Sequence, residues 1–228
     1  MSASGTQAGP VSPASDRGSL AYNLAGISII VLLLAVGMAY VIDRAGRNSA
    51  PPVPALGDTN PVVQTIGGRE LTIPTSWFRY GEQLKDGFAS QADLRFMLHI
   101  GENGASLPVD VTLQSRSRAR SSGALLDSVY LHQFEDGIVD GVPGLVGKRL
   151  KASEGYAAET VWYDPLSPAP FVAKCADGVT PENPARCLRT IHLRTGLAAV
   201  LSFDATALTG WRSFDEELAL WLGQIGAL

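Results

Sequence analysis

The sequence predicts an α+β protein: an N-terminal transmembrane helix, then one domain in which a large antiparallel sheet carries two packed helices. Three observations support this prediction. They are an uncharged apolar run near the N-terminus, several segments of alternating apolar and polar residues beyond it, and two amphipathic stretches with helical spacing. The predicted organisation is a disordered cytoplasmic tail over 1–19, a transmembrane helix over 20–42, a Pro-rich linker over 43–61 and an extracytoplasmic domain over 62–228.

The run from Leu20 to Ile42 contains no charged residue. As a helix it would span roughly 34 Å, enough to cross a hydrocarbon core of about 30 Å. Tyr22 and Tyr40 lie near its ends, where aromatic side chains favour the headgroup level. The run is longer than the apolar part of a signal peptide, and no small-residue cleavage site follows it. We therefore expect an uncleaved anchor in a bacterial inner membrane; the alternatives are a cleaved signal peptide and a buried core helix.

The segments on either side of the anchor are too poor in large apolar residues to form a core. Residues 1–19 are mainly Ser, Gly, Ala and Pro, a composition that does not offset the entropy of an unfolded chain. Residues 43–61 contain several prolines, which favour an extended and semi-rigid backbone. We expect the second segment to be a spacer between the membrane and the domain.

The two cysteines, Cys175 and Cys187, bracket a polar loop between two strand-like segments. This arrangement predicts a structural disulfide rather than a zinc site or a redox-active Cys-x-x-Cys pair. Closing such a loop stabilises a domain by roughly 3 kcal/mol in the chain-entropy model. Disulfides persist in the periplasm and not in the cytosol, so we expect the C-terminal domain in the periplasm. Basic residues flank both ends of the anchor, and the positive-inside rule therefore does not decide the orientation.

Beyond the linker, the pattern of apolar residues predicts mainly strands. The strand-like segments are 62–66, 69–73, 92–100, 109–113, 145–150, 156–163, 171–175, 187–193 and 197–203. The first two are separated by Gly67-Gly68, which predicts a tight hairpin turn. The clearest alternation is in 92–100, which has the pattern of a half-buried antiparallel strand.

Two segments have helical spacing. The first covers about 123–134, with Ser121 or Ser122 as its N-cap. The second closes the chain, and we expect Ser213 and Glu216 to form a capping box at its start. Its apolar residues recur on one face, and we expect Trp221 to be buried against the sheet. The residues on this face are Trp211, Phe214, Leu218, Trp221 and Ile225.

The start of the domain, Leu71-Thr72-Ile73-Pro74-Thr75-Ser76-Trp77, resembles the strand-Pro-x-x-Trp start of Mog1/PsbP-like and DcrB-like α/β sandwich domains. That resemblance covers this motif and the rough order of elements, and it implies a sandwich of sheet and helices. The whole chain is also similar to a group of uncharacterised bacterial single-pass membrane-anchored proteins. The anchor, the Tyr-Asp-Pro segment and the Cys…Cys-Leu-Arg segment carry this second resemblance, which implies no activity.

We find no sequence motif that identifies an enzyme. The three histidines, His99, His132 and His192, have no partner at metal-ligand spacing, and we expect neither a metal nor a cofactor. A nucleophile elbow, a P-loop and a dinucleotide-binding motif are missing from the sequence. A triad of Ser121 and Asp136 with either His99 or His132 has no support from spacing. The net charge of −4 also argues against a nucleic-acid partner.

Two basic runs form a candidate anion-binding patch. Arg116, Arg118 and Arg120 alternate along the chain, and Lys148 and Arg149 form a second run. If the first segment is extended, its three arginines point to one face. The ligand would then be an anionic headgroup, a cell-wall polymer or an acidic partner. The alternative is the solvated end of an ordinary strand.

Two functional hypotheses follow. The first is a non-catalytic periplasmic domain, anchored in the membrane, that binds a partner protein or an envelope component. It is favoured by the anchor, the spacer and the missing catalytic motifs. The alternative is a small envelope hydrolase whose catalytic residues the sequence does not identify. A deep polar pocket with a histidine beside a carboxylate would favour the hydrolase, whereas an apolar patch or an open sheet edge would favour the binding domain.

Overall fold

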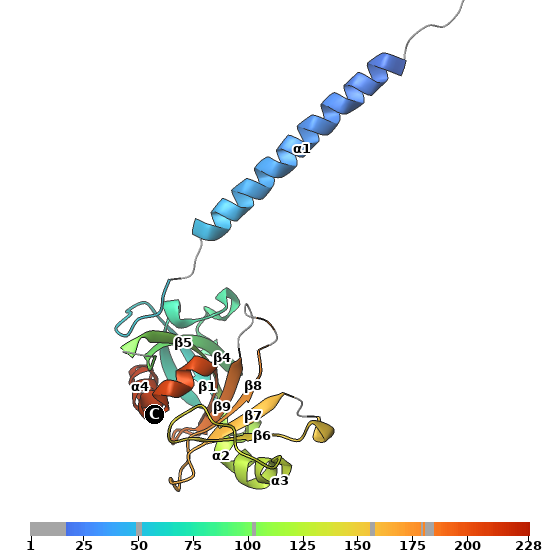
Figure 1. Cartoon of the computed structure of the whole chain (residues 1–228). Helices are drawn as coiled ribbons and strands as arrows, with labels where there is room; N and C mark the ends of the chain where they lie inside the picture. The colour runs from blue at the N-terminus through green and yellow to red at the C-terminus, as the bar shows by residue number, and fades with distance from the viewer. Residues whose placement is uncertain (1–16, 49–51, 102–103, 156–157, 179, 181–184) are drawn as a thin grey trace, which may run out of the picture. The chain divides into compact units, whose positions relative to one another are not determined.

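The computed structural model describes residues 17–48, 52–101, 104–155, 158–178, 180 and 185–228 (Figure 1). Most of the predicted tail over 1–19 and the first two residues of the predicted strand 156–163 lie outside these ranges. The chain divides into two units, Met1–Pro51 and Pro52–Leu228. The predicted α+β class is confirmed: an apolar N-terminal helix precedes a large antiparallel sheet, a small sheet and two further helical segments.

The first unit contains one long helix, α1 (Arg17–Asn48). It includes the whole predicted run from Leu20 to Ile42 and extends beyond both ends. Its segment Ala25–Arg44 has a mean hydropathy of 2.6, is long enough to cross a membrane, and has no buried part. An apolar helix that is exposed all round is typical of a membrane anchor or a signal sequence, so the uncleaved anchor stays a prediction.

The second unit contains two sheets. The small sheet has the order β2-β1-β3, with β1 (Pro61–Ile66), β2 (Arg69–Pro74) and β3 (Gly87–Phe88). The large sheet has the order β4-β5-β10-β9-β8-β7-β6, and its neighbouring strands pair antiparallel. Its strands are β4 (Gln91–His99), β5 (Ser106–Ser115), β6 (Val146–Arg149), β7 (Glu159–Tyr163), β8 (Val172–Ala176), β9 (Arg186–His192) and β10 (Leu197–Asp204).

Short helical turns connect several of these strands. The 3₁₀ turns are η1 (Thr75–Trp77), η2 (Gly81–Gln83), η4 (Arg116–Arg118), η6 (Ala152–Glu154) and η7 (Ala205–Gly210). The predicted hairpin between β1 and β2 is confirmed. Gly67 and Gly68 have φ angles of 57° and 82°, the left-handed conformation that its two-residue turn requires.

The main core lies between one face of the large sheet and the closing helix α4 (Trp211–Gln224). Trp221 is 2% exposed, which confirms its predicted burial. Its ring lies 4.7 Å from that of Trp77 and 5.1 Å from that of Phe96, measured between centroids. Trp77 follows β2 and Phe96 belongs to β4, so these three rings join the small sheet, the large sheet and the helix.

The predicted capping box at the start of α4 is wrong. The helix begins at Trp211, and the hydroxyl of Ser213 donates a hydrogen bond back to the carbonyl of Gly210 at 3.2 Å. The turn η7 leads directly into the helix, and it is capped at its own start by Asp204, which accepts from the backbone N–H of Thr206 at 2.9 Å. The helical path therefore begins before Ser213, which leaves this residue inside the helix rather than at its cap.

The other helical segment is interrupted. It consists of α2 (Ser122–Leu125), a π-helical turn η5 (Leu126–Tyr130) and α3 (Leu131–Gln133), instead of one helix over 123–134. Ser121 caps α2, as predicted, by accepting a hydrogen bond from the N–H of Ala124 at 3.3 Å. Inside the segment, the Ser128 hydroxyl donates to the Ala124 carbonyl at 2.6 Å, and such side-chain bonds compete with regular helical bonds.

This segment covers a second, smaller core. Leu126 and Tyr130 pack with Leu150, Val161 and Val172. Because successive residues of a strand point to opposite faces, Val161 lies on the face of β7 opposite to Trp162, which belongs to the main core. The large sheet is therefore covered by α4 on one face and, over β6 to β8, by the α2–α3 segment on the other.

The two units divide inside the predicted linker over 43–61. The residues that follow the division hydrogen-bond to the domain. The indole N–H of Trp77 donates to the carbonyl of Ala55 at 3.0 Å, and the N–H of Gly57 donates to the side chain of Gln224 at 3.0 Å. These contacts attach the second half of the predicted linker to the folded unit.

Cys175 and Cys187 form the predicted disulfide. Cys175 lies on β8 and Cys187 lies directly opposite on β9, with their Cα atoms 3.9 Å apart. The register between these strands pairs three residues of each, from Lys174↔Leu188 to Ala176↔Arg186. The bond therefore reinforces a short ladder in the middle of the large sheet.

Candidate functional site

The segment after β5 that carries Arg116 and Arg118 is a 3₁₀ turn, η4, so the condition that this segment is extended is not met. The N–H of Arg116 donates to the carbonyl of Gly196 in the turn between β9 and β10, at 3.0 Å. The N–H of Ala119 then donates to the carbonyl of Arg116 at 3.4 Å and closes the turn. The sheet ladder ends here because the neighbouring strand β10 starts only at Leu197.

The turn nevertheless brings the three arginines of the first basic run together. Arg116, Arg118 and Arg120 are exposed and line one broad, open cavity of about 1010 Å³, which we call the arginine pocket. The described residues that line it include no aspartate or glutamate. The lining residues are 115–121, Ala124, Ser128, His192 and Gly196. Positive charges without a carboxylate among them make this cavity a suitable place for an anion.

Two hydrogen bonds fix the segment that forms the pocket wall. The guanidinium of Arg118 donates to the carbonyl of Ser90 at 3.1 Å. Nε2 of His192 lies 2.8 Å from the carbonyl oxygen of Ala119. Because a carbonyl only accepts, Nε2 carries the proton and donates in this bond. The wall of the arginine pocket is therefore fixed to β9 on one side and to Ser90, the residue before β4, on the other.

The second basic run lies elsewhere. Lys148 and Arg149 belong to β6, an edge strand of the large sheet, and neither lines the arginine pocket. Arg149 lies 3.5 Å from the carboxylate of Asp177, and both side chains are half exposed. The predicted patch is thus divided between two places in the domain, and anion binding by any of its residues stays a prediction.

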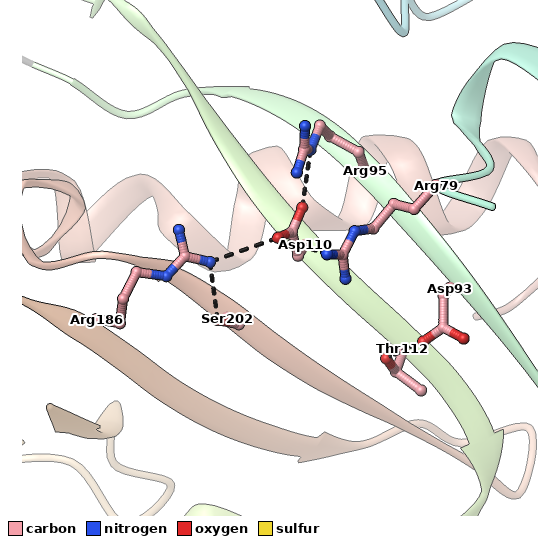
Figure 2. A network of polar contacts seen from close by, with 7 residues as sticks. All are labelled: Arg79, Asp93, Arg95, Asp110, Thr112, Arg186 and Ser202. Atoms are coloured by element: carbon pink, nitrogen blue, oxygen red, sulfur yellow. Dashed lines mark hydrogen bonds and ion pairs between the residues drawn. The ribbon is translucent and has the colours of Figure 1, made fainter. Parts of the chain in front are cut away.

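A second arginine cluster, which the sequence did not predict, surrounds Asp110 (Figure 2). The carboxylate of Asp110 on β5 lies 2.8 Å from Arg95 on β4, and 3.4 Å from both Arg186 on β9 and Arg79. Arg186 also donates to the hydroxyl of Ser202 on β10 at 2.9 Å. The hydrogen bond to Asp110 raises the pKa of Arg95 above its ordinary value. We call Arg79, Arg95, Arg186 and Asp110 the Asp110 cluster.

Asp93 lies beside this cluster and is 7% exposed. Its carboxylate accepts hydrogen bonds from Thr112 at 2.5 Å, from Gln83 at 2.8 Å and from Gln91 at 2.9 Å. Burial by itself raises the pKa of Asp93, but these hydrogen bonds and the charge of Arg79 outweigh burial and lower it below its ordinary value. The ionised form is therefore the one that the fold stabilises.

Replacing Asp93 with asparagine should lower the free energy of unfolding at pH 7 by about 2 kcal/mol, since hydrogen bonds to a charged group are lost. The amide would also point an N–H group at side-chain donors. Because the pKa of Asp93 is lowered by folding, its contribution is present above the unfolded pKa of about 3.9 and is lost as the pH falls through the folded pKa. Urea unfolding at several pH values should therefore show a weaker acid dependence below about pH 4 for Asp93→Asn.

The matched control for this prediction is Asp136→Asn, which changes an exposed loop carboxylate. This control should keep both the stability and the acid dependence of the original protein. An Asp93→Asn variant with an unchanged acid dependence would show that its carboxylate is not stabilised by folding.

A second cavity of about 700 Å³ lies beside β9, between α2 and the loop before β8. It contains the polar combination that the hydrolase hypothesis requires, since Ser121, His192 and Asp215 all line it. Each of these groups, however, has a structural partner. Ser121 caps α2, His192 donates to Ala119, and the carboxylate of Asp215 is bound by both terminal nitrogens of Arg189.

The triad considered from the sequence is not assembled. His99 lies 3.4 Å from Glu217 of α4 and lines a different cavity from Ser121. His132 is on α3, and Asp136 is in the loop that follows it. Within the described part of the chain, we find no group of three or more His, Cys, Asp or Glu side chains that could hold a metal ion.

We compared the chain with known proteins. No family model matches it, and no curated protein matches it. A solved structure with a similar arrangement of elements is Smlt3025, described as an immunity protein of the Stenotrophomonas maltophilia type IV secretion system. The two chains are 13% identical, the TM-score is 0.47, and the alignment covers 72% of this chain and 92% of the other. The resemblances to Mog1/PsbP-like domains and to bacterial single-pass proteins remain expectations from the sequence.

Proposed function

We propose that this chain is a membrane-anchored, non-catalytic binding protein, whose domain binds an anionic group of a partner protein or envelope component in the arginine pocket. The observation that carries the proposal is the convergence of Arg116, Arg118 and Arg120 on one open cavity whose described lining contains no carboxylate. Guanidinium groups form paired, charge-assisted hydrogen bonds with carboxylates and phosphates. Serine hydroxyls in the same lining supply further donors.

The proposed location is a bacterial inner membrane, with the N-terminus inside and the domain in the periplasm. The exposed apolar segment Ala25–Arg44 supports the anchor. The Cys175–Cys187 bond supports a domain outside the cytoplasm, because the cytosol keeps such thiols reduced. Two observations support a non-catalytic role: Ser121 and His192 each have a structural hydrogen bond, and the carboxylate of Asp215 is paired with an arginine.

Binding of inorganic pyrophosphate to the full chain in nanodiscs of neutral lipid, measured by titration calorimetry, tests this function. The double variant Arg116→Ala/Arg120→Ala should weaken binding at least about tenfold, since it removes two charged donors. Arg118 is kept because its bond to Ser90 fixes the segment. The matched control is Lys148→Ala/Arg149→Ala, which removes the same positive charge outside the pocket and should leave binding unchanged within about twofold.

Two results would contradict the proposed function. Equal losses in both double variants would show that anions are attracted by general charge and not by the arginine pocket. The absence of pyrophosphate binding by the original protein would reject the pocket as an anion site.

A further inference from the structure

In the Asp110 cluster, three arginines surround one carboxylate, so the cluster itself has a net positive charge. The side chain of Asp110 is 11% exposed, while those of Arg79, Arg95 and Arg186 are 28%, 45% and 44% exposed. Figure 2 shows the three guanidinium groups turned toward Asp110 from different sides. Two further carboxylates lie nearby, but each has other partners: Asp93 accepts hydrogen bonds from Thr112, Gln83 and Gln91, and Asp204, opposite Arg186 in the register, caps the turn at Thr206. Like charges held this close favour the approach of a further anion.

The cluster is also preorganised. The contacts with Asp110 use one nitrogen of each guanidinium, namely Nε of Arg95 and a terminal nitrogen of Arg79 and of Arg186. A guanidinium has five N–H donors, so each arginine keeps donors beyond the one used. Asp110 already fixes the three side chains. Binding of a carboxylate would therefore cause a smaller loss of side-chain conformational entropy.

This cluster and the arginine pocket belong to the same face of the large sheet. Asp110 lies opposite Ser202, and Ser202 lies opposite Leu188 on the next strand. Successive outward positions of β9 after Leu188 are Thr190 and His192, and the latter lines the arginine pocket. Along β5, the six residues from Asp110 to Arg116 span roughly 20 Å. The two arginine clusters therefore lie near opposite ends of the same strands, on the same face of the large sheet.

The surface between the two clusters has a different character. Leu188 is 49% exposed and lies opposite Ser202 on β10 and Lys174 on β8, whose ammonium group pairs with Glu159. The next outward row, toward the arginine pocket, consists of the half-buried Thr112, Val200 and Thr190. The described apolar residues of the main core point to the opposite face of these strands, as Val111 does on β5. A small apolar centre flanked by arginines resembles the composition of protein–protein interfaces, in which arginine is enriched.

We propose that this open face is the docking surface for an acidic segment of a partner protein. The segment would place carboxylates on the Asp110 cluster and in the arginine pocket, and an apolar side chain against Leu188. This proposal rests on the proposed function, because one end of the docking surface is the arginine pocket. It goes further by identifying the anionic ligand as part of a protein. A membrane surface is the less suitable occupant, because the clusters lie apart with Leu188 between them and not in one basic patch.

A synthetic peptide tests the docking surface. The probe is an eight-residue fluorescent peptide with two glutamates at each end and leucine and threonine between them, which spans roughly the distance between the clusters when extended. Its binding to the full chain in neutral-lipid nanodiscs is measured by anisotropy. Leu188→Asp and Arg186→Ala should each weaken binding at least about fivefold. Leu188→Asp should leave pyrophosphate binding unchanged, because Leu188 lies outside the lining of the arginine pocket and supplies no positive charge.

The matched control is Arg69→Ala, which removes an exposed arginine from β2 in the small sheet. It should bind the peptide like the original protein. All three replaced side chains are exposed, so unchanged melting temperatures should show that the variants fold. A peptide with glutamates at one end only should bind at least about tenfold more weakly, since it reaches one cluster.

The outcomes separate this inference from the proposed function. If Leu188→Asp and Arg186→Ala bind the peptide like the original protein, the docking surface is refuted, whatever happens with pyrophosphate. If phosphatidylglycerol vesicles bind instead of the peptide and lose binding in the same variants, the occupant is a membrane and the inference is overturned. If pyrophosphate does not bind but both variants lose the peptide, the docking surface is supported and the proposed function fails.

Discussion

Replacing Trp221 with alanine is expected to lower the free energy of unfolding by about 3–5 kcal/mol. The side chain is 2% exposed and stacks on Phe96, with ring planes 21° apart. It also contacts Trp77, so its loss would leave a cavity at the point where the helix meets both sheets. That loss is a large part of the stability of an ordinary domain.

Urea unfolding of the full chain in nanodiscs, followed by circular dichroism, should measure this loss. Leu220→Ala is the matched control, because Leu220 is the neighbouring residue on α4 and is 56% exposed. Its effect should stay within about 0.5 kcal/mol. A Trp221→Ala variant as stable as this control would mean that α4 is not a core element.

Replacing Asp215 with alanine is expected to cost about 3 kcal/mol, because it leaves the buried guanidinium of Arg189 without its counter-charge. The side chain of Arg189 is 6% exposed, and its two terminal nitrogens bind the two oxygens of Asp215. We expect the lower end of the range for buried pairs for two reasons. Asp215 is itself 59% exposed, and the ring of Phe171, 4.3 Å from the guanidinium, stabilises the cation in part.

Two further variants identify the cause of this loss. Glu216→Ala removes an exposed carboxylate next to Asp215 and should have little effect. Arg189→Met/Asp215→Ala removes both charges and should recover most of the stability, since apolar residues often replace a buried pair at no cost. The same urea experiment measures all three. A double variant no more stable than Asp215→Ala would show that the uncompensated charge is not the cause.

Local patterns predicted most elements of the fold. The alternation in 92–100 predicted β4, and the pair Gly67-Gly68 predicted the hairpin between β1 and β2. Both patterns depend only on residues that are close in the sequence. The order of the strands did not follow from the sequence. β10 lies between β5 and β9 and so pairs with a strand more than 80 residues away, a contact that no local pattern records.

The helical errors have a physical cause as well. The α2–α3 segment has an apolar stripe, but Ser128 bonds back to Ala124 and the segment contains a π-helical turn. The apolar stripe predicts that a helix forms but does not predict how its hydrogen bonds are arranged. At α4, Ser213 and Glu216 fit a capping box, while the preceding turn η7 already fixes the start of the helix.

The sequence predicted only those site residues that lie close together along the chain. Arg116, Arg118 and Arg120 are close in sequence, so their charge was visible, although their turn was not. The Asp110 cluster takes its members from three strands and a loop, and only the pairing of β4, β5, β10 and β9 brings them together. Alternation alone could have placed Asp110 and Arg95 on outward positions. It could not have shown that they face each other.

The position of α4 has a consequence for how the protein is made. The rings that Trp221 contacts come from Trp77 and Phe96, more than 120 residues earlier in the chain, and Ile225 accepts a hydrogen bond from Thr72 at 3.3 Å. The main core therefore cannot close until the last helix has been synthesised. In the proposed topology, a translocation channel would receive a chain whose domain has not yet folded. Because the domain folds late, its polypeptide stays unfolded long enough to pass through the channel.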